Sequence, residues 1–168
     1  MNEITITKVN HLETNKIMQL VEESTLEGFR HLKRLVSDYE AGTNRFDKDG
    51  EALFIATQNG DIVGVCGLNQ DPIAGNGRVR RLYVLPDARR FGIGRLLMEA
   101  VITEAKNYYR MLVLKTDNPA GHLNFEGAAN VQAHQFLASL LGAQLLARSF
   151  RDTSRFDMIA DGLLSALT

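Results

Sequence analysis

A short turn rich in arginine and glycine is the strongest chemical signal in this sequence. It spans residues 89–95, RRFGIGR, between a predicted strand that ends at Pro86 and a predicted helix that begins near Ile93. Glycine has no Cβ, so the backbone at Gly92 and Gly94 can approach a ligand closely and direct successive N–H groups toward it. The first N–H groups of a helix lack intrahelical acceptors and carry a partial positive charge of about half a unit. With three arginines added, the turn predicts an anion site suited to pyrophosphate.

Two common phosphate-binding motifs do not fit this turn. The dinucleotide-binding pattern needs a third glycine where this chain has Leu97, and it follows the first strand of its domain rather than the fourth. The P-loop pattern needs a Gly-Lys pair followed by serine or threonine, and the chain contains none. The turn therefore indicates a pyrophosphate ligand of another kind, with a nucleotide held in a different way as an open alternative.

The composition is that of an ordinary globular domain. The chain has 168 residues, 45% of them apolar and 23% charged, which predicts a single domain over residues 1–168. No apolar run approaches the roughly 18 residues of a membrane span, and the first ten residues lack a basic region followed by an apolar stretch. We therefore expect a soluble, cytoplasmic protein that does not bind membranes.

The charged residues and the single cysteine indicate which kinds of ligand and metal site the chain can form. A net charge of −1 argues against a dedicated nucleic-acid binder. The lone Cys66 cannot form an internal disulfide or a cysteine-based metal cluster, and its apolar neighbours predict a buried small side chain. Six arginines nevertheless gather in one segment, which predicts a local anion site, with some of the six forming only a solvated strand face. They are Arg78, Arg80, Arg81, Arg89, Arg90 and Arg95.

The elements that position the turn can be read from hydrophobic spacing. Alternation over residues 3–9 predicts a first strand. Helical spacing from about Thr14, interrupted near Gly28, predicts two helices that end before Ala41-Gly42. Residues 51–58 and 61–68 are apolar runs joined by Asn59-Gly60, a strong hairpin signal.

The fourth strand is predicted over residues 78–86, RVRRLYVLP. Its apolar positions change parity between Val79 and Leu82, which permits a β-bulge near Arg80 and Arg81. Proline at position 86 stops the strand.

The remainder of the chain predicts a βαβ unit and its continuation. Leu97, Val101, Ala105 and Tyr108 share one helical face, and residues 111–114, MLVL, form a buried strand that the right-handed crossover rule places parallel to the fourth. Residues 118–129 predict a long loop, residues 130–141 a helix, and residues 143–151 and 155–160 a closing pair of strands.

In these motifs and in element order the sequence resembles the GNAT acyltransferases. Their shared motif is Gln or Arg followed by x-x-G-x-G or x-x-G-x-A between the fourth strand and the third helix, and Arg89, Gly92 and Gly94 match it. The resemblance covers most of the chain. It implies an α/β (α+β) GNAT fold, with a mixed central sheet of about seven strands, about four flanking helices, and strands four and five parallel and splayed.

The resemblance also implies a cofactor site for acetyl-CoA. In the family, backbone N–H groups of the turn bind the CoA pyrophosphate, and the fourth strand faces the pantetheine arm and the acyl carbonyl. Asn130 opens an Asn-x-x-Ala motif similar to one whose Asn contacts the pantetheine, although an ordinary helix N-cap is an equal alternative. The implied cofactor-binding residues are Leu82, Tyr83, Val84, Arg89, Arg90, Phe91, Gly92, Ile93, Gly94, Arg95 and Asn130.

The sequence departs from the family where the proton donor is expected. Many members carry a Tyr seven residues after the Asn, placed to protonate the departing CoA thiolate, and here Leu137 or Ala138 stands in its place, depending on the register. His134 could act as acid or base, or be a surface residue on a helix flank. A thiol has an ordinary pKa near 8.5, so water could also supply the proton.

The attacking amine needs a proton acceptor, because an alkylamine of pKa about 10.4 is mostly protonated at pH 7. Asp117, at the end of the fifth strand, is the first candidate for this base, with an Asx-turn in Thr-Asp-Asn-Pro as the structural alternative. Asp38 and Glu40 are further candidates if the second helix walls the acceptor site, and otherwise are solvated helix charges.

Together these features predict an N-acetyltransferase that moves an acetyl group from acetyl-CoA to a primary amine by direct attack in a ternary complex, without a metal. The acceptor is a small-molecule amine or a peptide or protein amine, and a homodimer is compatible with the sequence. The alternative is a non-catalytic acyl-CoA-binding or regulatory module of the same fold, since loss of the Tyr would remove turnover and leave binding.

Overall fold

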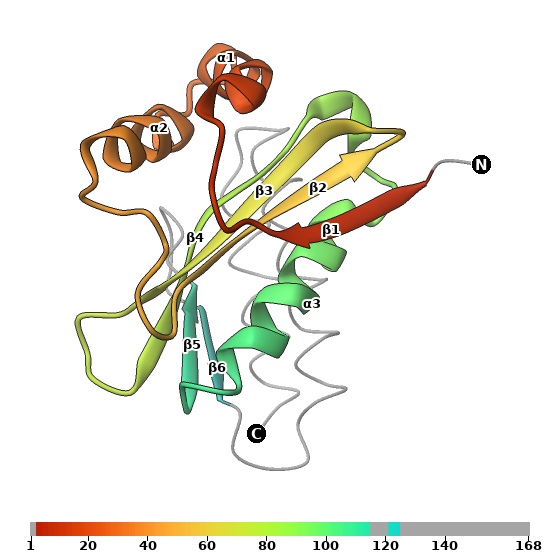
Figure 1. The fold of residues 1–168 in the computed structure, drawn as a ribbon. Helices are drawn as coiled ribbons and strands as arrows, with labels where there is room; N and C mark the ends of the chain where they lie inside the picture. Colours follow the sequence, from red (N-terminus) through yellow and green to blue (C-terminus); the bar gives the residue numbers. More distant parts are fainter. Residues whose placement is uncertain (1–2, 115–120, 125–168) are drawn as a thin grey trace.

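The computed structural model describes residues 3–114 and 121–124, which form a mixed sheet with strand order β1-β2-β3-β4-β5-β6. Its helices are packed on the two faces of that sheet (Figure 1). In chain order the elements are β1 (Ile4–Lys8), the 3-10 turn η1 (Thr14–Ile17), α1 (Met18–Leu26), α2 (His31–Ala41), β2 (Ala52–Gln58), β3 (Asp61–Gln70), β4 (Asn76–Val84), the 3-10 turn η2 (Pro86–Ala88), α3 (Ile93–Ala105), β5 (Met111–Leu114) and β6 (Gly121–Asn124).

Two glycines of β3 show which helices cover which face of the sheet. A Cβ placed on Gly64 would lie 3.1 Å from Leu97 and 3.4 Å from Ile93, both in α3. A Cβ on Gly67, which has the opposite parity, would meet the ring of Phe46, just after α2. Because alternate residues of a strand point to opposite faces, α3 covers one face and α1 and α2 cover the other. We call these the α3 face and the α1/α2 face.

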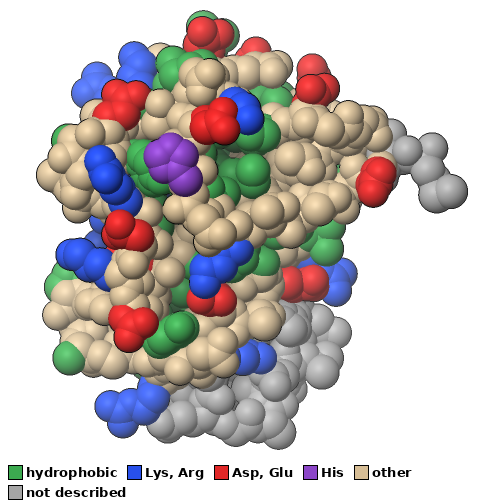
Figure 2. All heavy atoms as spheres, in the orientation of Figure 1, with side chains coloured by type: hydrophobic (Ala, Val, Ile, Leu, Met, Phe, Trp, Pro, Cys, Tyr) green, Lys and Arg blue, Asp and Glu red, His purple; other side chains and the backbone are tan. Residues whose placement is uncertain are grey.

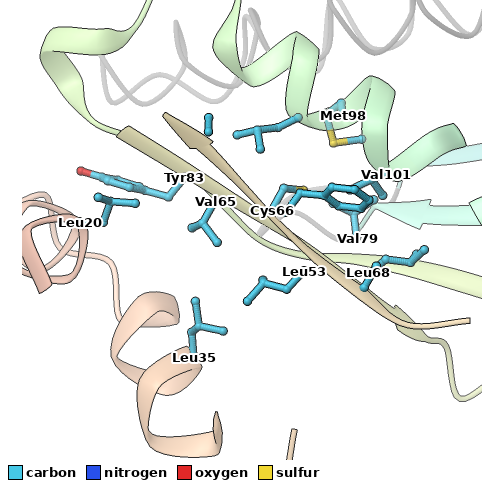
Figure 3. Packing of buried hydrophobic residues seen from close by; sticks show 14 of the residues in the cluster. Leu20, Leu35, Leu53, Val65, Cys66, Leu68, Val79, Tyr83, Met98 and Val101 are labelled. Carbon is cyan, nitrogen blue, oxygen red and sulfur yellow. The ribbon is translucent and has the colours of Figure 1, made fainter. Parts of the chain in front are cut away.

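The hydrophobic core is divided between these two faces (Figure 3). Toward α1 and α2 it contains Leu20, Leu35, Leu53, Val65 and Tyr83, and toward α3 it contains Cys66, Leu68, Val79, Met98 and Val101. Cys66 is fully buried, as predicted, and burial raises the pKa of its thiol far above the ordinary value. The thiol is therefore a packing group rather than a nucleophile.

The predicted hairpin and helix break are confirmed. Asn59 and Gly60 both have positive φ, at 53° and 93°, and they connect Gln58 to its pairing partner Asp61. This is the backbone that a two-residue hairpin turn with the right-handed twist requires, and Asn-Gly adopts it at little cost. Gly28, at φ 87°, separates α1 from α2.

The β-bulge that the parity change permits is present in β4. Gly67 of β3 pairs with Arg80 and Val65 pairs with Tyr83, so a single residue of β3 faces two residues of β4. One of those two, Arg81, has a φ of 62°, in the left-handed region that non-glycine residues rarely adopt. The extra residue interrupts the usual alternation, and consecutive side chains in β4 consequently point to the same face.

The pairing of β4 with β5 is parallel, as predicted from the crossover. It joins Asn76–Val79 to Met111–Leu114. From residue 80 onward, the described strand pairing of β4 is with β3 only. The predicted fourth helix and the closing strands of the sheet lie outside the described residues.

Two predictions from the sequence were wrong in detail. Residues 121–124, predicted as part of a long loop, form β6, which pairs antiparallel with β5. This segment has no strong strand signal of its own, and the unpaired edge of β5 supplies the backbone partners that make it a strand. Tyr108 was expected on the buried face of α3, but the helix ends at Ala105 and Tyr108 is 49% exposed.

The surface carries both signs of charge. Figure 2 shows Lys and Arg interspersed with Asp and Glu over the face that it presents, without a broad area of one sign. Among the described helices, none has the length and apolar character needed to cross a lipid bilayer.

Tight packing over Gly77 gives a prediction about stability. A Cβ at Gly77 would lie 2.5 to 3.0 Å from three ring atoms of Tyr109, whose hydroxyl donates a 2.6 Å hydrogen bond to the Gly50 carbonyl. The ring therefore cannot move away without breaking that bond. We expect Gly77→Ala to lower the free energy of unfolding by about 1–3 kcal/mol in urea denaturation.

Gly94→Ala is the matched control for this measurement. The nearest heavy atom to a Cβ at Gly94 is 3.9 Å away, and the position lies in the first turn of α3. We expect no loss of stability there, because alanine favours a helix over glycine. Equal stability of Gly77→Ala and wild type would show that the Tyr109 ring adapts freely.

Candidate functional site

The predicted anion-binding turn connects β4 to α3 through η2. The backbone N–H of Arg89 donates to the Pro86 carbonyl at 3.2 Å and completes η2. Arg90 and Gly92 then adopt left-handed backbone, at φ 72° and 78°, and α3 begins at Ile93. A non-glycine residue held in this conformation is uncommon and often marks a functional turn.

The N-terminus of α3 is open to a ligand. Leu96 is the first residue at this end whose backbone N–H has an acceptor in the helix or its cap. It donates to the Gly92 carbonyl at 3.0 Å. The N–H groups of residues 93–95 have no intrahelical acceptor, and Gly92 supplies no side-chain cap. A Cβ at Gly92 would find no atom within 4 Å, and one at Gly94 would find only Val84, at 3.9 Å. An anion can therefore reach these N–H groups without a steric obstacle from the described residues.

The side chains of the three arginines in the turn are not equivalent. Arg89 makes two hydrogen bonds to the Glu27 carboxylate, at 2.8 and 2.7 Å, and its Nε donates to the Val84 carbonyl at 2.9 Å. Arg95 pairs with Glu99 at 2.9 Å, one helical turn away. Arg90 is exposed and makes no ion pair with any described residue. Of these three side chains, Arg90 is the one whose charge is left available to a ligand.

Glu27, at the end of α1, organises a small polar cluster beside the turn. It accepts a 3.0 Å hydrogen bond from the Tyr83 hydroxyl in addition to the two from Arg89, whose guanidinium lies 5.5 Å from the Tyr83 ring centre. Burial and the Glu27 carboxylate raise the pKa of the Tyr83 hydroxyl well above its ordinary value. Burial alone would lower the pKa of Arg89, but the hydrogen bonds and charge of Glu27 raise it. Both groups therefore keep their protons at physiological pH.

The backbone of β4 beyond the bulge presents N–H groups on the side away from β3. The N–H of Leu85 donates to the Val63 carbonyl of β3 at 2.8 Å, whereas the Val84 carbonyl accepts from Arg89 and faces away. Because N–H groups alternate along a strand, those of Leu82 and Val84 point away from β3, and the Tyr83 backbone points toward it. Leu82 and Val84 thus direct backbone donors to the edge of β4 opposite β3, and the residues that follow β5 in the chain, 115–120, lie outside the described residues.

The six arginines that cluster in the sequence form two groups in the structure. Arg89, Arg90 and Arg95 lie in the turn, and the other three lie in β4 before or within the bulge. Arg81 is not on a solvated strand face, because it is only 9% exposed and its Nη2 lies 3.2 Å from the Asp38 carboxylate of α2. The sequence predicted one local anion site, whereas the structure separates the six arginines into two basic regions.

The residues proposed for proton transfer and for the pantetheine contact lie outside the described residues. These are Asp117, Asn130 and His134, together with Leu137 and Ala138, which replace the expected Tyr. Sequence reasoning missed Glu27, which lies 62 positions from Arg89. No spacing rule connects two residues so far apart, so no local signal identifies it.

Comparison with known proteins agrees with this geometry. The model of the acetyltransferase (GNAT) family matches residues 15–124. An IAA acetyltransferase of Azospirillum brasilense is 31% identical over 113 residues, which cover 63% of this chain and 68% of that one.

Solved structures give the same result. A crystal structure from Exiguobacterium sp. 255-15, assigned as an acetyltransferase, shares 34% identity and a TM-score of 0.64, covering 69% of this chain and 78% of that one. A GNAT family acetyltransferase from Brucella melitensis, solved with acetyl-CoA, has a TM-score of 0.57 at 17% identity, covering 76% and 91% of the two chains, and supports the fold alone. The family model includes the whole turn and the bulged strand, and the chain therefore belongs to the GNAT acetyltransferase family.

Proposed function

We propose that this chain transfers an acetyl group from acetyl-CoA to a primary amine, by direct attack within a ternary complex. The observation that carries the proposal is the unobstructed N-terminus of α3. There, N–H groups without an intrahelical acceptor, left-handed Arg90 and Gly92, and a guanidinium that forms no ion pair with a described residue all belong to one turn. Such a site suits a pyrophosphate better than a single carboxylate, because it offers several donors along one turn.

The acetyl group would lie along β4 beyond the bulge. The N–H groups of Leu82 and Val84 face away from β3, where they could donate to the thioester carbonyl as negative charge develops on its oxygen. The amine nitrogen attacks the carbonyl carbon, a C–N bond forms, and the C–S bond breaks as CoA leaves as a thiolate. Holding both reactants on one strand contributes to the rate by removing most of the entropic cost of their encounter.

Proton transfer is assigned to groups beyond the described residues. Asp117 is proposed as the base that accepts the amine proton, and His134 as a group that can return a proton to the thiolate. A thiolate with a conjugate-acid pKa near 8.5 can also take its proton from water, so the lack of a Tyr at Leu137 or Ala138 is compatible with turnover.

The Arg89 guanidinium is proposed to position the turn rather than to bind phosphate. Its hydrogen bonds to Glu27 and to the Val84 carbonyl connect the end of α1, the end of β4 and the start of the turn. The backbone that follows Arg89 then presents its N–H groups, and Arg90 supplies the charge that the pyrophosphate meets. This arrangement keeps a permanent cation near the site without leaving it unpaired in the absence of ligand.

A non-catalytic acyl-CoA-binding module is the second candidate, because the usual proton-donating Tyr is absent. Acetyl-CoA at 100 times its Kd should add about 2.7 kcal/mol of stability under either proposal. We expect acetyl-CoA to raise the Tm, and a panel of primary amines to give sustained release of CoA thiol. A Tm increase without amine-dependent release favours the binding module. No Tm increase at millimolar acetyl-CoA contradicts both.

Gly94 allows a charge to be placed in the proposed pyrophosphate site without straining the backbone. We expect Gly94→Glu to raise the Kd for acetyl-CoA about tenfold or more in calorimetric titration, because its carboxylate competes with the pyrophosphate for the same N–H groups. The fold should be retained, since an acidic residue in the first turn of a helix stabilises it by about 0.3–1 kcal/mol.

Gly94→Gln is the matched control, with the same length and no charge. We expect it to weaken binding by less than about threefold. If the two variants weaken acetyl-CoA binding equally, the effect is steric and an anion at the N-terminus of α3 is contradicted.

The Glu27–Arg89 pair should be energetically coupled. Its bidentate geometry, and side chains that are only 26% and 27% exposed, predict a coupling free energy of about 1–2 kcal/mol in a double-mutant cycle of Glu27→Gln and Arg89→Gln. The exposed Arg95–Glu99 pair, at 65% and 35%, should give less than about 0.5 kcal/mol in the same urea experiment. Equal coupling of the two pairs would contradict the positioning role of Arg89.

A further inference from the structure

Three arginines of β4 point to the α1/α2 face, and the bulge places the third of them there. Arg80 pairs with Gly67, which faces Phe46, and Arg78 lies two residues earlier with the same parity. Arg81 follows immediately, yet its side chain reaches Asp38 on the same face. A regular strand would have sent Arg81 to the opposite face, into the apolar packing against α3.

The cations in this group outnumber the anions near them. Arg34 of α2 lies close enough to lower the pKa of both Arg80 and Arg81, so four guanidinium groups share the region. Asp38 acts on both of these arginines, and Glu51 acts on Arg80. Among the described residues, these four positive charges and two negative ones leave an excess of two. The only ion pair that the described residues form within the group is Arg81–Asp38.

Burial makes this excess costly. The Arg81 side chain is 7% exposed, and its Nε donor has no hydrogen-bond partner among the described residues. Arg80 is half-buried and makes no ion pair within the described chain. Burial, followed by repulsion from neighbouring arginines, lowers the pKa of both groups. A buried donor without an acceptor and an unbalanced buried cation are features that a bound anion would relieve.

The group lies beside the proposed acetyl position. Leu82 directly follows Arg81, and at about 3.3 Å per residue, Arg80 is about 7 Å along the strand from it. An amine that attacks an acetyl group near Leu82 and Val84 would therefore have its other substituents within reach of these guanidinium groups. The pyrophosphate site is at the far end of β4, beyond Pro86, and is a separate anion site.

We propose that Arg78, Arg80 and Arg81 bind a carboxylate of the acceptor. The acceptors would then be amines that carry a carboxylate group, an inference that rests on the proposed acetyl transfer. A guanidinium matches a carboxylate with two parallel N–H···O hydrogen bonds. The Asp38 carboxylate, 3.2 Å from Arg81, is an observed example of a carboxylate bound by a guanidinium of this group, and we take it as the guide to the ligand.

The test compares acceptors in matched sets: an amino acid, its carboxamide, the amine without the carboxyl group, and an amine that carries a phosphate. We expect wild-type protein to give a kcat/KM at least tenfold higher for the carboxylate member. In Arg80→Gln, the ratio of carboxylate to carboxamide kcat/KM should fall about 10- to 100-fold, with an unchanged Kd for acetyl-CoA. Arg80→Lys should restore part of the ratio, because a lysine keeps the charge but not the bidentate geometry.

Arg110→Gln is the control variant, since it removes an exposed arginine at the start of β5, at the opposite end of β4 from the bulge. It should leave the ratio unchanged. A binding arm separates this inference from the proposed function: equilibrium titration of N-acetylated amino acids and their amides needs no turnover. Carboxylate preference in binding that Arg80→Gln removes supports the subsite even if no amine is acetylated. Equal binding and turnover of carboxylate and carboxamide, a phosphate preference, or an equal loss in Arg110→Gln would each overturn it.

Discussion

One extra residue in β4 determines how the rest of the candidate site is arranged. The bulge places Arg81 and the residue that follows it opposite a single residue of β3. It also holds Arg81 at a φ of 62°. A non-glycine residue in this region costs about 1–3 kcal/mol, and it persists only when the surrounding structure over-determines it. Here the strand pairing on both sides of the bulge and the hydrogen bond to Asp38 supply that constraint.

The bulge also separates two differently described parts of β4. Before it, β4 is paired on both edges, with β3 and with β5. After it, the N–H groups of Leu82 and Val84 face away from β3, and residues 115–120, which follow β5 in the chain, lie outside the described residues. An unpaired N–H group in a central strand is costly when water is excluded, and in the proposed complex the thioester carbonyl would supply an acceptor.

The turn after β4 depends on a contact that joins distant parts of the chain. Glu27 lies at the end of the α1 layer, and Arg89 lies at the start of the turn, so their hydrogen bonds hold the turn against the α1/α2 face. The Tyr83 hydroxyl donates to the same carboxylate and adds a link to the end of β4. Movement of α1 would therefore be transmitted to the backbone that presents N–H groups to the proposed pyrophosphate. The Glu27 carboxylate thus joins α1, the end of β4 and the start of the turn.

Features that depend only on neighbouring residues could be predicted from the sequence. Asn59-Gly60 predicted the hairpin because few other dipeptides adopt two positive φ angles, and the parity change around Arg80 was compatible with a bulge because a strand has a period of two. The prediction failed where the cause is tertiary: β6 forms on the free edge of β5, and the Glu27–Arg89 contact depends on how α1 packs against β4. Asp117, Asn130 and His134 stay predictions.

The two arginine groups show why composition alone could not resolve the site. A net charge of −1 conceals two local excesses of positive charge at the two ends of one strand. In the turn, Arg89 and Arg95 are already paired, so most of the attraction for an anion comes from backbone N–H groups and Arg90. In β4 the reverse holds, because the strand backbone is paired and the guanidinium groups supply the attraction. The proposed pyrophosphate site therefore depends on backbone geometry, whereas the proposed carboxylate site depends on side chains that a substitution can remove.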